Sequence, residues 1–270
     1  MIESSEITSL LTKAAGYYGY DFTGYAAASI RRRVEAFYIK GRHNSFNEMQ
    51  ERLLSDRSYF MHFAEEITVN VTEMFRDPLF FKNLRENILP VLATYPFIRI
   101  WHAGCSTGEE VYSMAILLRE TNLLHKSILY ATDINQSVLE KAKTGIFPVS
   151  AMQQNSDNYI KSGGTNDFSN YYHSNYNAVK FDSSLSERMI FSNHNLTSDE
   201  SFNEFQLILC RNVLIYFTRE LQARVTTLFD KSLDSLGYLA LGSKESLRFS
   251  PIASHYKQED NKEKIWRKNR

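Results

Sequence analysis

Apolar residues near the N-terminus recur at the three- and four-residue spacing of amphipathic helices. The first such face carries Ile7, Leu10, Leu11 and Ala14. Further helical patterns cover residues 26–40 and 59–69. Between them, Ser45 followed by Glu48 matches a capping box and predicts another helix start. Residues 1–75 are therefore expected to form a small all-helical domain.

Beyond residue 90 the pattern changes to short apolar runs separated by helical stretches. The runs suited to buried strands are residues 97–103, 127–132, 189–191, 205–210 and 238–241, with 264–267 as a closing edge strand. The helical stretches between them are residues 109–120, 137–143 and 221–236. Strands that alternate with helices predict an α/β domain with a parallel sheet, which we place at residues 91–270, after a linker at 76–90.

One segment breaks this alternation. Residues 155–180 are rich in Asn, Ser, Gly and Tyr, and Gly163 and Gly164 form a turn signal within them. This composition predicts an insertion, either a small hairpin or a three-stranded piece, that occupies about residues 155–190. The predicted fold class is thus α/β, with a small helical N-terminal domain and a small β insertion.

The composition sets limits on the partner and the compartment. Of 270 residues, 43% are hydrophobic and 23% are charged, as in ordinary globular proteins. The 31 basic and 31 acidic residues balance, so no global charge favours nucleic acid or an anionic membrane as the partner. No apolar run reaches the roughly 20 residues that span a bilayer. The N-terminus lacks a secretory signal pattern, so we expect a cytoplasmic protein without membrane insertion.

Cysteine and histidine usage points away from disulfides and metals. The two cysteines, Cys105 and Cys210, lie far apart in apolar surroundings, so we expect reduced, buried thiols; a disulfide between them is the alternative. The seven histidines show no metal-ligand spacing, which predicts that the protein holds no metal. His102 falls in a predicted strand and is expected to be a hydrogen-bonded core residue.

Candidate chemistry begins where the first two predicted strands end. Gly104 and Gly108 bracket a short loop between a strand and a helix, and Asp133 ends the next strand. Ligands of open α/β sheets bind at the carboxyl ends of strands, where a carboxylate can accept hydrogen bonds from ribose hydroxyls. The loop has neither the dinucleotide-binding nor the P-loop spacing. These residues favour a nucleoside pocket, although a plain turn and a helix cap at Asp133 explain them as well.

Glu109 and Glu110 open the helix that follows this loop. Acidic residues in a first helical turn are stabilised by the helix dipole, which is one explanation for them. The other explanation is that Glu110 pairs with a ligand cation, such as the ammonium group of S-adenosylmethionine.

Four stretches together resemble the CheR-type chemotaxis receptor glutamate methyltransferases. They are residues 68–78 (TVNVTEMFRDP), 100–113 (IWHAGCSTGEEVYS), 131–134 (ATDI) and 210–217 (CRNVLIYF), and residues 195–196 and 241–247 also fit. Their order and spacing extend over nearly the whole chain. The departures are Val111 in place of a proline and Met74 in place of an aromatic residue, and neither removes a polar ligand group. The tyrosine-rich insertion matches the family poorly.

The resemblance implies a Rossmann-like methyltransferase sheet, with S-adenosylmethionine as cofactor and S-adenosylhomocysteine as product. In the family pattern, Glu110 and Asp133 hold the amino and ribose groups of the cofactor. The resemblance implies eleven cofactor-binding residues, including both glycines of the loop. They are Asn70, Thr72, Arg76, Gly104, Gly108, Glu110, Asp133, Asn195, Leu196, Arg211 and Asn212.

The reaction implied by the resemblance is methylation of glutamate side chains on chemoreceptors. A glutamate with an ordinary pKa of about 4.3 is already ionised near neutral pH, so no general base is needed, and none stands out in the sequence. Arg76 and Tyr216 are the candidate catalytic residues. Arg76 can act on the cofactor carboxylate or near the substrate. Tyr216 can orient the acceptor oxygen or can equally be a core tyrosine, and Phe75 is expected to serve in packing.

Arg31, Arg32 and Arg33 form a local basic cluster. They either dock the acidic methylation region in the cytoplasmic helical domain of a receptor or form a solvated helix face, because consecutive helical residues cannot all point one way. Two other functions stay open. One is a cofactor-binding sensor or scaffold with little or no methyl transfer, and the other is a methyltransferase for a different acceptor. The protein is expected to be a monomer.

Overall fold

The computed structural model describes residues 2–68 and 72–269. The chain divides into two compact units. Unit 1 comprises Met1–Val69 and Leu214–Val225, and unit 2 comprises Asn70–Val213 and Thr226–Arg270. A segment from late in the chain therefore completes the N-terminal unit.

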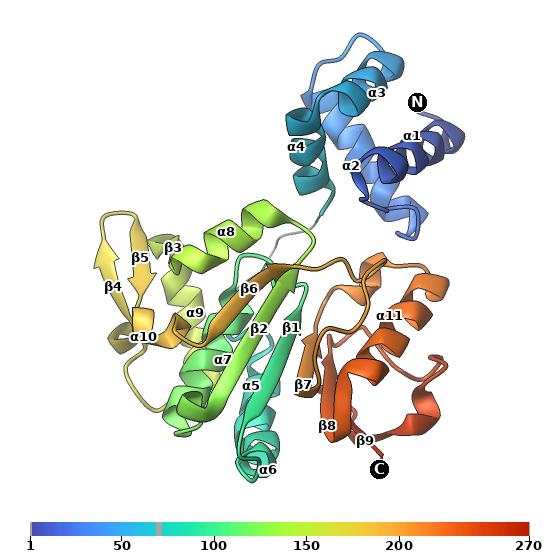
Figure 1. Ribbon diagram of the computed structural model, residues 1–270. Coiled ribbons are helices and arrows are strands. Elements are labelled where there is room, and N and C mark those ends of the chain that lie inside the picture. The colour runs from blue at the N-terminus through green and yellow to red at the C-terminus, as the bar shows by residue number, and fades with distance from the viewer. Residues whose placement is uncertain (1, 69–71, 270) are drawn as a thin grey trace. The chain divides into compact units, whose positions relative to one another are not determined.

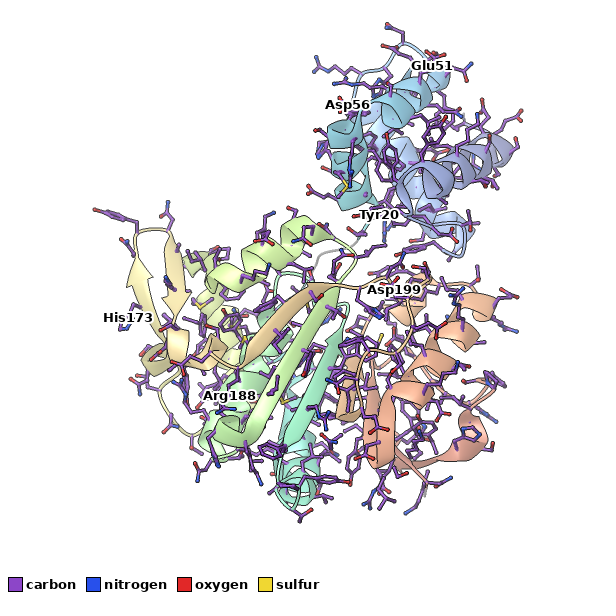
Figure 2. The ribbon with its side chains drawn as sticks, in the orientation of Figure 1. Tyr20, Glu51, Asp56, His173, Arg188 and Asp199 are labelled. Carbon is purple, nitrogen blue, oxygen red and sulfur yellow. The ribbon has the colours of Figure 1, made fainter. Side chains whose placement is uncertain are left out.

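Unit 1 is helical, as the sequence predicts. Its elements are α1 (Ser4–Tyr18), α2 (Ala27–Lys40), α3 (Phe46–Ser55), α4 (Arg57–Ile67), the 3-10 turn η5 (Leu214–Tyr216) and the first part of α11 (Arg219–Ser232). The Ser45 hydroxyl caps α3 by accepting from the N–H of Glu48 at 3.2 Å, while the Glu48 carboxylate accepts from the N–H of Asn44 rather than from Ser45. Asp56, labelled in Figure 2, caps α4 by accepting from the N–H of Tyr59 at 3.1 Å.

A short antiparallel bridge between Tyr25 and Phe217 completes this unit. Beside it, the N–H of Ala26 donates to the carbonyl of Tyr216 at 2.8 Å. The rings of Tyr25 and Phe217 meet edge to face with their centroids 5.0 Å apart. These contacts explain why residues 214–225 belong with the N-terminal helices.

Unit 2 is built on a seven-stranded sheet in the order β6-β2-β1-β7-β8-β10-β9 (Figure 1). The strands are β1 (Ile98–Ala103), β2 (Ser127–Asp133), β6 (Met189–Asn193), β7 (Phe205–Cys210), β8 (Leu233–Leu241), β9 (Tyr256–Asp260) and β10 (Ile265–Lys268). The first five in sheet order are parallel, and β10 is antiparallel to β8 and β9. Since β1 lies between β2 and β7, the strand order reverses there, which is where open α/β sheets bind ligands.

Helices and short helical turns surround this sheet. They are α5 (Pro78–Asn83), the π-helical turn η1 (Leu84–Ile88), α6 (Leu89–Leu92), α7 (Glu109–Glu120), η2 (Leu124–Lys126), α8 (Gln136–Thr144), η3 (Val149–Ala151), α9 (Met152–Lys161), η4 (Phe168–Tyr171), α10 (Ser183–Ser186), η6 (Ala253–His255) and the last part of α11. Most of the stretch expected as a linker is thus helical and lies in unit 2. Strand β1 is buried on both faces, as a central parallel strand should be.

The predicted β insertion is a small antiparallel sheet. Its strands are β3 (Ile146–Pro148), β4 (Tyr172–Asn175) and β5 (Ala178–Phe181), in the order β3-β5-β4. Figure 1 shows β4 and β5 as a yellow hairpin, and His173 on β4 is labelled in Figure 2. Within this small sheet the rings of Phe147 and Phe181 pack edge to face, with their centroids 5.5 Å apart.

Two element boundaries and the edge strand of the large sheet differ from those predicted. Residues 152–161 form α9, so part of the expected insertion is helical. Helix α11 ends at Ser232, although its apolar pattern runs on to residue 236, because Leu233 already pairs with Phe205 of the neighbouring β7. Strand β10 is paired on both sides, so β9 and not β10 forms the edge of the sheet. Cys105 and Cys210 are both free and buried.

Candidate functional site

The loop after β1 has an unusual backbone. The φ angles of Gly104, Ser106 and Gly108 are +79°, +51° and +95°. The N–H groups of Gly104 and Cys105 both donate to the carbonyl of Thr132, at 2.8 and 2.9 Å, and so tie the loop to the end of β2. The buried Ser106 hydroxyl has no hydrogen-bond partner among the described residues. A strained, non-glycine residue with an unpaired polar atom is typical of a binding loop.

Asp133 closes β2 beside this loop, as predicted. Its Oδ2 accepts from the N–H of Ser106 at 2.9 Å, and its Oδ1 accepts from the N–H of Asn135 at 2.9 Å. The pKa of Asp133 lies above its usual value because desolvation raises it by more than the backbone N–H groups lower it. The helix-capping role that could have explained Asp133 belongs to Asn135, whose side chain caps α8. Asp133 is therefore available for a ligand.

Glu110 lies in the first turn of α7 with its side chain 19% exposed. Its Oε1 is 2.8 Å from Nδ1 of His102, and its Oε2 is 3.4 Å from Nη1 of Arg211. Burial alone would raise the pKa of Glu110, but the contacts with His102 and Arg211 outweigh it, so the pKa lies below its usual value. Glu110 is held as a carboxylate. His102 is fully buried and hydrogen-bonded, which confirms its expected core position.

Three carboxylates surround the loop. Burial raises the pKa of the Cys105 thiol most, and the charges of Asp133, Glu110 and Glu109 raise it further. Glu109 accepts from the Thr107 hydroxyl at 2.7 Å, and burial raises its own pKa. The acidic residues singled out in the sequence are thus gathered at the carboxyl ends of β1 and β2.

Arg211 connects this cluster to the start of α5. Its Nη2 donates to Asp77 at 2.6 Å, and its Nη1 donates to the backbone carbonyl of Arg76 at 3.2 Å. The guanidinium lies 4.0 Å from the centroid of the Phe80 ring, and the side chain is only 3% exposed. Arg211 therefore joins the segment that carries Arg76 to the carboxylate of Glu110.

Asn212 follows Arg211 with φ at +62°. Its N–H donates to Oε2 of Glu245 at 3.0 Å, and the same oxygen accepts from the N–H of Gly242 at 2.6 Å. Glu245 is buried. Glu245 lies in residues 241–247, a stretch that fits the family pattern, and this fit is the sequence signal for it. The sequence does not predict that Glu245 holds the backbone of Asn212.

The segment that carries Arg76 is anchored by polar residues that the sequence did not single out. The N–H of Met74 donates to Asn155 at 3.1 Å, and Asn158 donates to the carbonyl of Met74 at 3.0 Å. The N–H of Phe75 donates to the Ser113 hydroxyl at 2.9 Å. The Phe75 side chain is fully buried, which confirms its packing role. Of the other residues expected nearby, Thr72 is half-buried and Asn70 lies outside the described residues.

Asn195 and Leu196 lie in the loop after β6, the strand that pairs with β2 as far as Asp133. The Asn195 amide oxygen accepts from the N–H and the hydroxyl of Thr197, at 3.0 and 2.8 Å. Its N–H donates to Asp199, labelled in Figure 2, at 2.8 Å. These bonds shape the loop beside the ribose-binding candidate.

The remaining predicted residues belong to unit 1. Arg31 pairs with Glu35 at 3.0 Å and donates to a backbone carbonyl at 3.2 Å, and Arg32 is exposed. Arg33 donates to the carbonyl of Ile67, and its guanidinium lies 5.0 Å from the centroid of the Tyr216 ring. The three arginines thus point to different surroundings.

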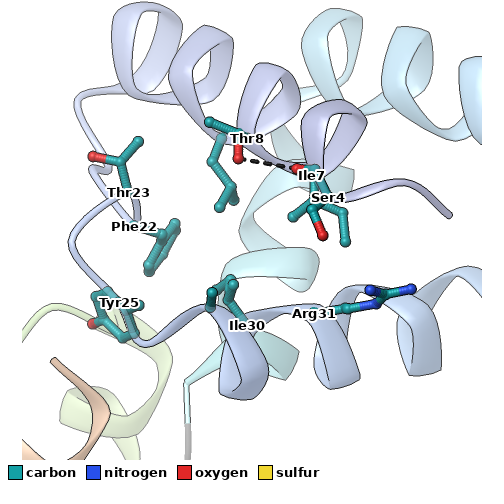
Figure 3. Close-up of a pocket in the computed structure, with 10 residues that line it drawn as sticks. Ser4, Ile7, Thr8, Phe22, Thr23, Tyr25, Ile30 and Arg31 are labelled. Carbon is teal, nitrogen blue, oxygen red and sulfur yellow. Dashed lines mark hydrogen bonds between the residues drawn. The ribbon is translucent and has the colours of Figure 1, made fainter. Parts of the chain in front are cut away.

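Unit 1 also contains a small pocket (Figure 3) between α1, α2 and the loop that joins them. Its base is apolar, with Ile7, Phe22, Tyr25 and Ile30. Arg31 at its rim is the single lining residue that the sequence had suggested for a functional role.

Residues 2–68 and 72–269 contain no cluster of three or more His, Cys, Asp or Glu side chains that could hold a metal ion. Over the same residues, no helix has the length and apolar character needed to cross a membrane.

Two family models match the chain. Residues 70–264 match the CheR methyltransferase, SAM binding domain, and residues 5–68 match the CheR methyltransferase, all-alpha domain. The Pseudomonas putida protein Cher3 is 45% identical over 264 residues, which cover 98% of this chain and 97% of that protein. The chemotaxis protein methyltransferase of Listeria innocua is 31% identical over 237 residues, 85% of each chain. That of Borreliella burgdorferi is 34% identical over 197 residues, 68% and 67% of the two chains.

Proposed function

Because this chain belongs to the CheR methyltransferase family and contains its S-adenosylmethionine-binding domain, we propose that it methylates glutamate side chains of chemoreceptors. The observation that carries the proposal is the match to both family domains together with the carboxylates gathered at the ends of β1 and β2. Relatives named chemotaxis protein methyltransferase support a receptor as the acceptor.

The residues present suit the cofactor. Asp133 has a carboxylate at the end of β2 whose free lone pairs can accept from ribose hydroxyls. Glu110, held ionised, can pair with the ammonium group. The Ser106 hydroxyl, which finds no hydrogen-bond partner within residues 2–68 and 72–269, offers a further donor and acceptor within the same loop. When bound, the cofactor supplies an electrophilic methyl carbon on a sulfonium.

The acceptor glutamate needs no proton removed, because it is already ionised near neutral pH. The task of the protein is therefore to hold one carboxylate oxygen in line with the methyl group at about 3–3.5 Å and to exclude water. The backbone of Arg76 is fixed by Arg211, so we assign Arg76 to this region of unit 2. Of the three arginines proposed for receptor docking, we retain Arg32, since Arg31 and Arg33 are engaged within unit 1.

The test is transfer of a labelled methyl group from S-adenosylmethionine to a helical receptor fragment, scored as a base-labile ester. We expect transfer by the wild type, and a loss of at least about tenfold in Glu110→Gln and Asp133→Asn, since each removes a charge-assisted contact. Glu204→Gln, at an exposed position outside the site, is the matched control and should keep full activity.

Two results would replace the proposal. Tight binding of S-adenosylhomocysteine without methylation of any receptor fragment would identify a sensor or scaffold. Label that reaches a different acceptor would identify a methyltransferase of another specificity.

A further inference from the structure

His102 is the closest hydrogen-bonding neighbour of Glu110. The distance from its Nδ1 to Oε1 of Glu110 is 2.8 Å, whereas Arg211 approaches the other oxygen only to 3.4 Å. The shortest hydrogen bond of Arg211 among the described residues goes instead to Asp77, at 2.6 Å. The orientation of the Glu110 carboxylate is therefore set mainly by the imidazole.

The surroundings of His102 fix where its proton lies. In the sheet it is directly opposite Ala131 of β2 and Leu209 of β7, and residues opposite one another share a face. Both neighbours are apolar and fully buried, and the His102 side chain is fully buried as well. Its Nε2 has no hydrogen-bond partner among the described residues. A carboxylate oxygen can only accept, and Nε2 has no acceptor for a proton among the described residues, so the geometry places the donating N–H of His102 on Nδ1.

We propose that His102 is a positioning residue for the cofactor: its Nδ1–H holds Glu110 in the orientation in which the carboxylate receives the ligand ammonium group. The inference rests on the assignment of Glu110 in the proposed function. It adds that a residue of the β1 strand, which touches no ligand itself, controls affinity for the amino acid part of the cofactor and not for the nucleoside part.

Two ligands separate these parts. S-adenosylhomocysteine carries the ammonium group, and 5′-methylthioadenosine keeps the nucleoside and sulfur but lacks it. We expect His102→Leu, which removes the donor, to weaken S-adenosylhomocysteine binding roughly tenfold and to leave 5′-methylthioadenosine binding within about twofold, measured by calorimetry. His102→Asn places an N–H near the position of Nδ1 and should restore most of the affinity. In a Glu110→Gln background, His102→Leu should have no further effect.

Equal weakening of both ligands, or a His102→Asn variant as weak as His102→Leu, would overturn the proposal, because either result describes a residue that only supports the fold. Nitrogen-15 NMR of the wild type gives a second, ligand-free readout. The His102 signal, identified by its loss in His102→Asn, should show a protonated Nδ1 and an unprotonated Nε2. A ring whose Nδ1 carries no proton contradicts the proposal, because such a ring cannot donate to Glu110.

The two proposals fail in different ways. If the wild type binds S-adenosylhomocysteine but methylates no receptor fragment, the proposed function fails and the ligand comparison still decides the role of His102. If methylation succeeds while both His102 variants bind the two ligands like the wild type, only the role of His102 is lost.

Discussion

At Gly104 the backbone and the packing place the same demand on the residue. Its φ of +79° lies in the left-handed region, where side chains other than that of glycine are strained. A Cβ atom built there would come within 2.6 Å of Cγ2 of Val213. Glycine is therefore needed by the protein itself, before any ligand is considered.

We expect Gly104→Ala to lower the free energy of unfolding of unit 2 by about 2 kcal/mol or more, from left-handed strain plus the clash with Val213. Denaturant unfolding followed by tryptophan fluorescence measures this, since Trp101 and Trp266 both lie in unit 2.

The control is Gly16→Ala in α1, where a Cβ atom meets nothing within 4 Å. Alanine in place of this glycine, in the last turn of α1, should stabilise unit 1 by about 0.5 kcal/mol, seen as a later loss of helical circular dichroism. Similar losses in both variants would contradict the argument from strain at Gly104.

The sequence predicts a site residue when a single helix or strand determines where its side chain lies. Asp133 and Glu110 could be found because a strand end and a first helical turn determine where their side chains lie. The contact of Glu245 with Asn212 and that of Asn155 with Met74 could not be predicted, because they join residues 33 and 81 positions apart and no local spacing encodes such a contact.

At the scale of elements, a buried polar network holds four segments together. The Glu120 side chain at the end of α7 is 5% exposed and pairs with Arg85 of the π-helical turn η1. Its Oε1 accepts from Tyr159 of α9, from Tyr171 of η4 at 2.7 Å and from Asn166 at 3.3 Å. The network thus ties the region of the β insertion to the helices of unit 2.

Burial alone would raise the pKa of Glu120, but the bonds from Tyr159, Arg85 and Tyr171 outweigh it, so the pKa lies below its usual value. A lowered folded-state pKa stabilises the protein above the unfolded-state pKa of about 4.3, and this stabilisation is lost as the pH falls through the folded-state pKa. We expect Glu120→Gln to lower the free energy of unfolding by about 2 kcal/mol at pH 7.

The pH dependence provides the sharper measurement. The difference between wild type and Glu120→Gln should narrow as the pH falls below about 4.3, because the wild-type carboxylate then becomes protonated. Glu204→Gln, at an exposed position, should change stability by less than about 0.5 kcal/mol at either pH. A difference at Glu120 that stays constant from pH 7 to the acid side would show that the charge contributes nothing.

Element boundaries were least predictable where pairing competes with periodicity. Residues 221–236 have a continuous helical apolar pattern, yet β8 begins at Leu233 because its partner β7 lies alongside. Helix α9 was missed because residues 155–161 are mostly polar, and its buried Asn155 and Asn158 are recognisable as core positions only once their bonds to Met74 are known.

At the scale of the whole molecule, one helix contributes to both units. The N-terminal part of α11, through Val225, belongs to unit 1 with the N-terminal helices. The remainder of the helix belongs to unit 2 with the large sheet. Leu221 lies against Gly24 of unit 1, where an added Cβ would come within 2.8 Å of its side chain. Phe229, two turns later, packs on Trp101 of unit 2 with ring centroids 5.4 Å apart. The sequence shows one amphipathic helix and gives no sign of this division.

This division predicts that two truncations on the same helix act on different parts of the protein. Leu221→Ala should cost about 2–5 kcal/mol and Phe229→Ala about 3–5 kcal/mol, because each opens a cavity at a buried position. Hydrogen exchange read by mass spectrometry should show Leu221→Ala losing protection in α1 and α2, roughly two hundred residues earlier in the chain, with the strands of the large sheet unchanged. Phe229→Ala should lose protection in the strands of the large sheet and leave α1 and α2 unchanged. Loss of protection in both units in either variant would show that α11 transmits instability along its length and that the two units unfold as one.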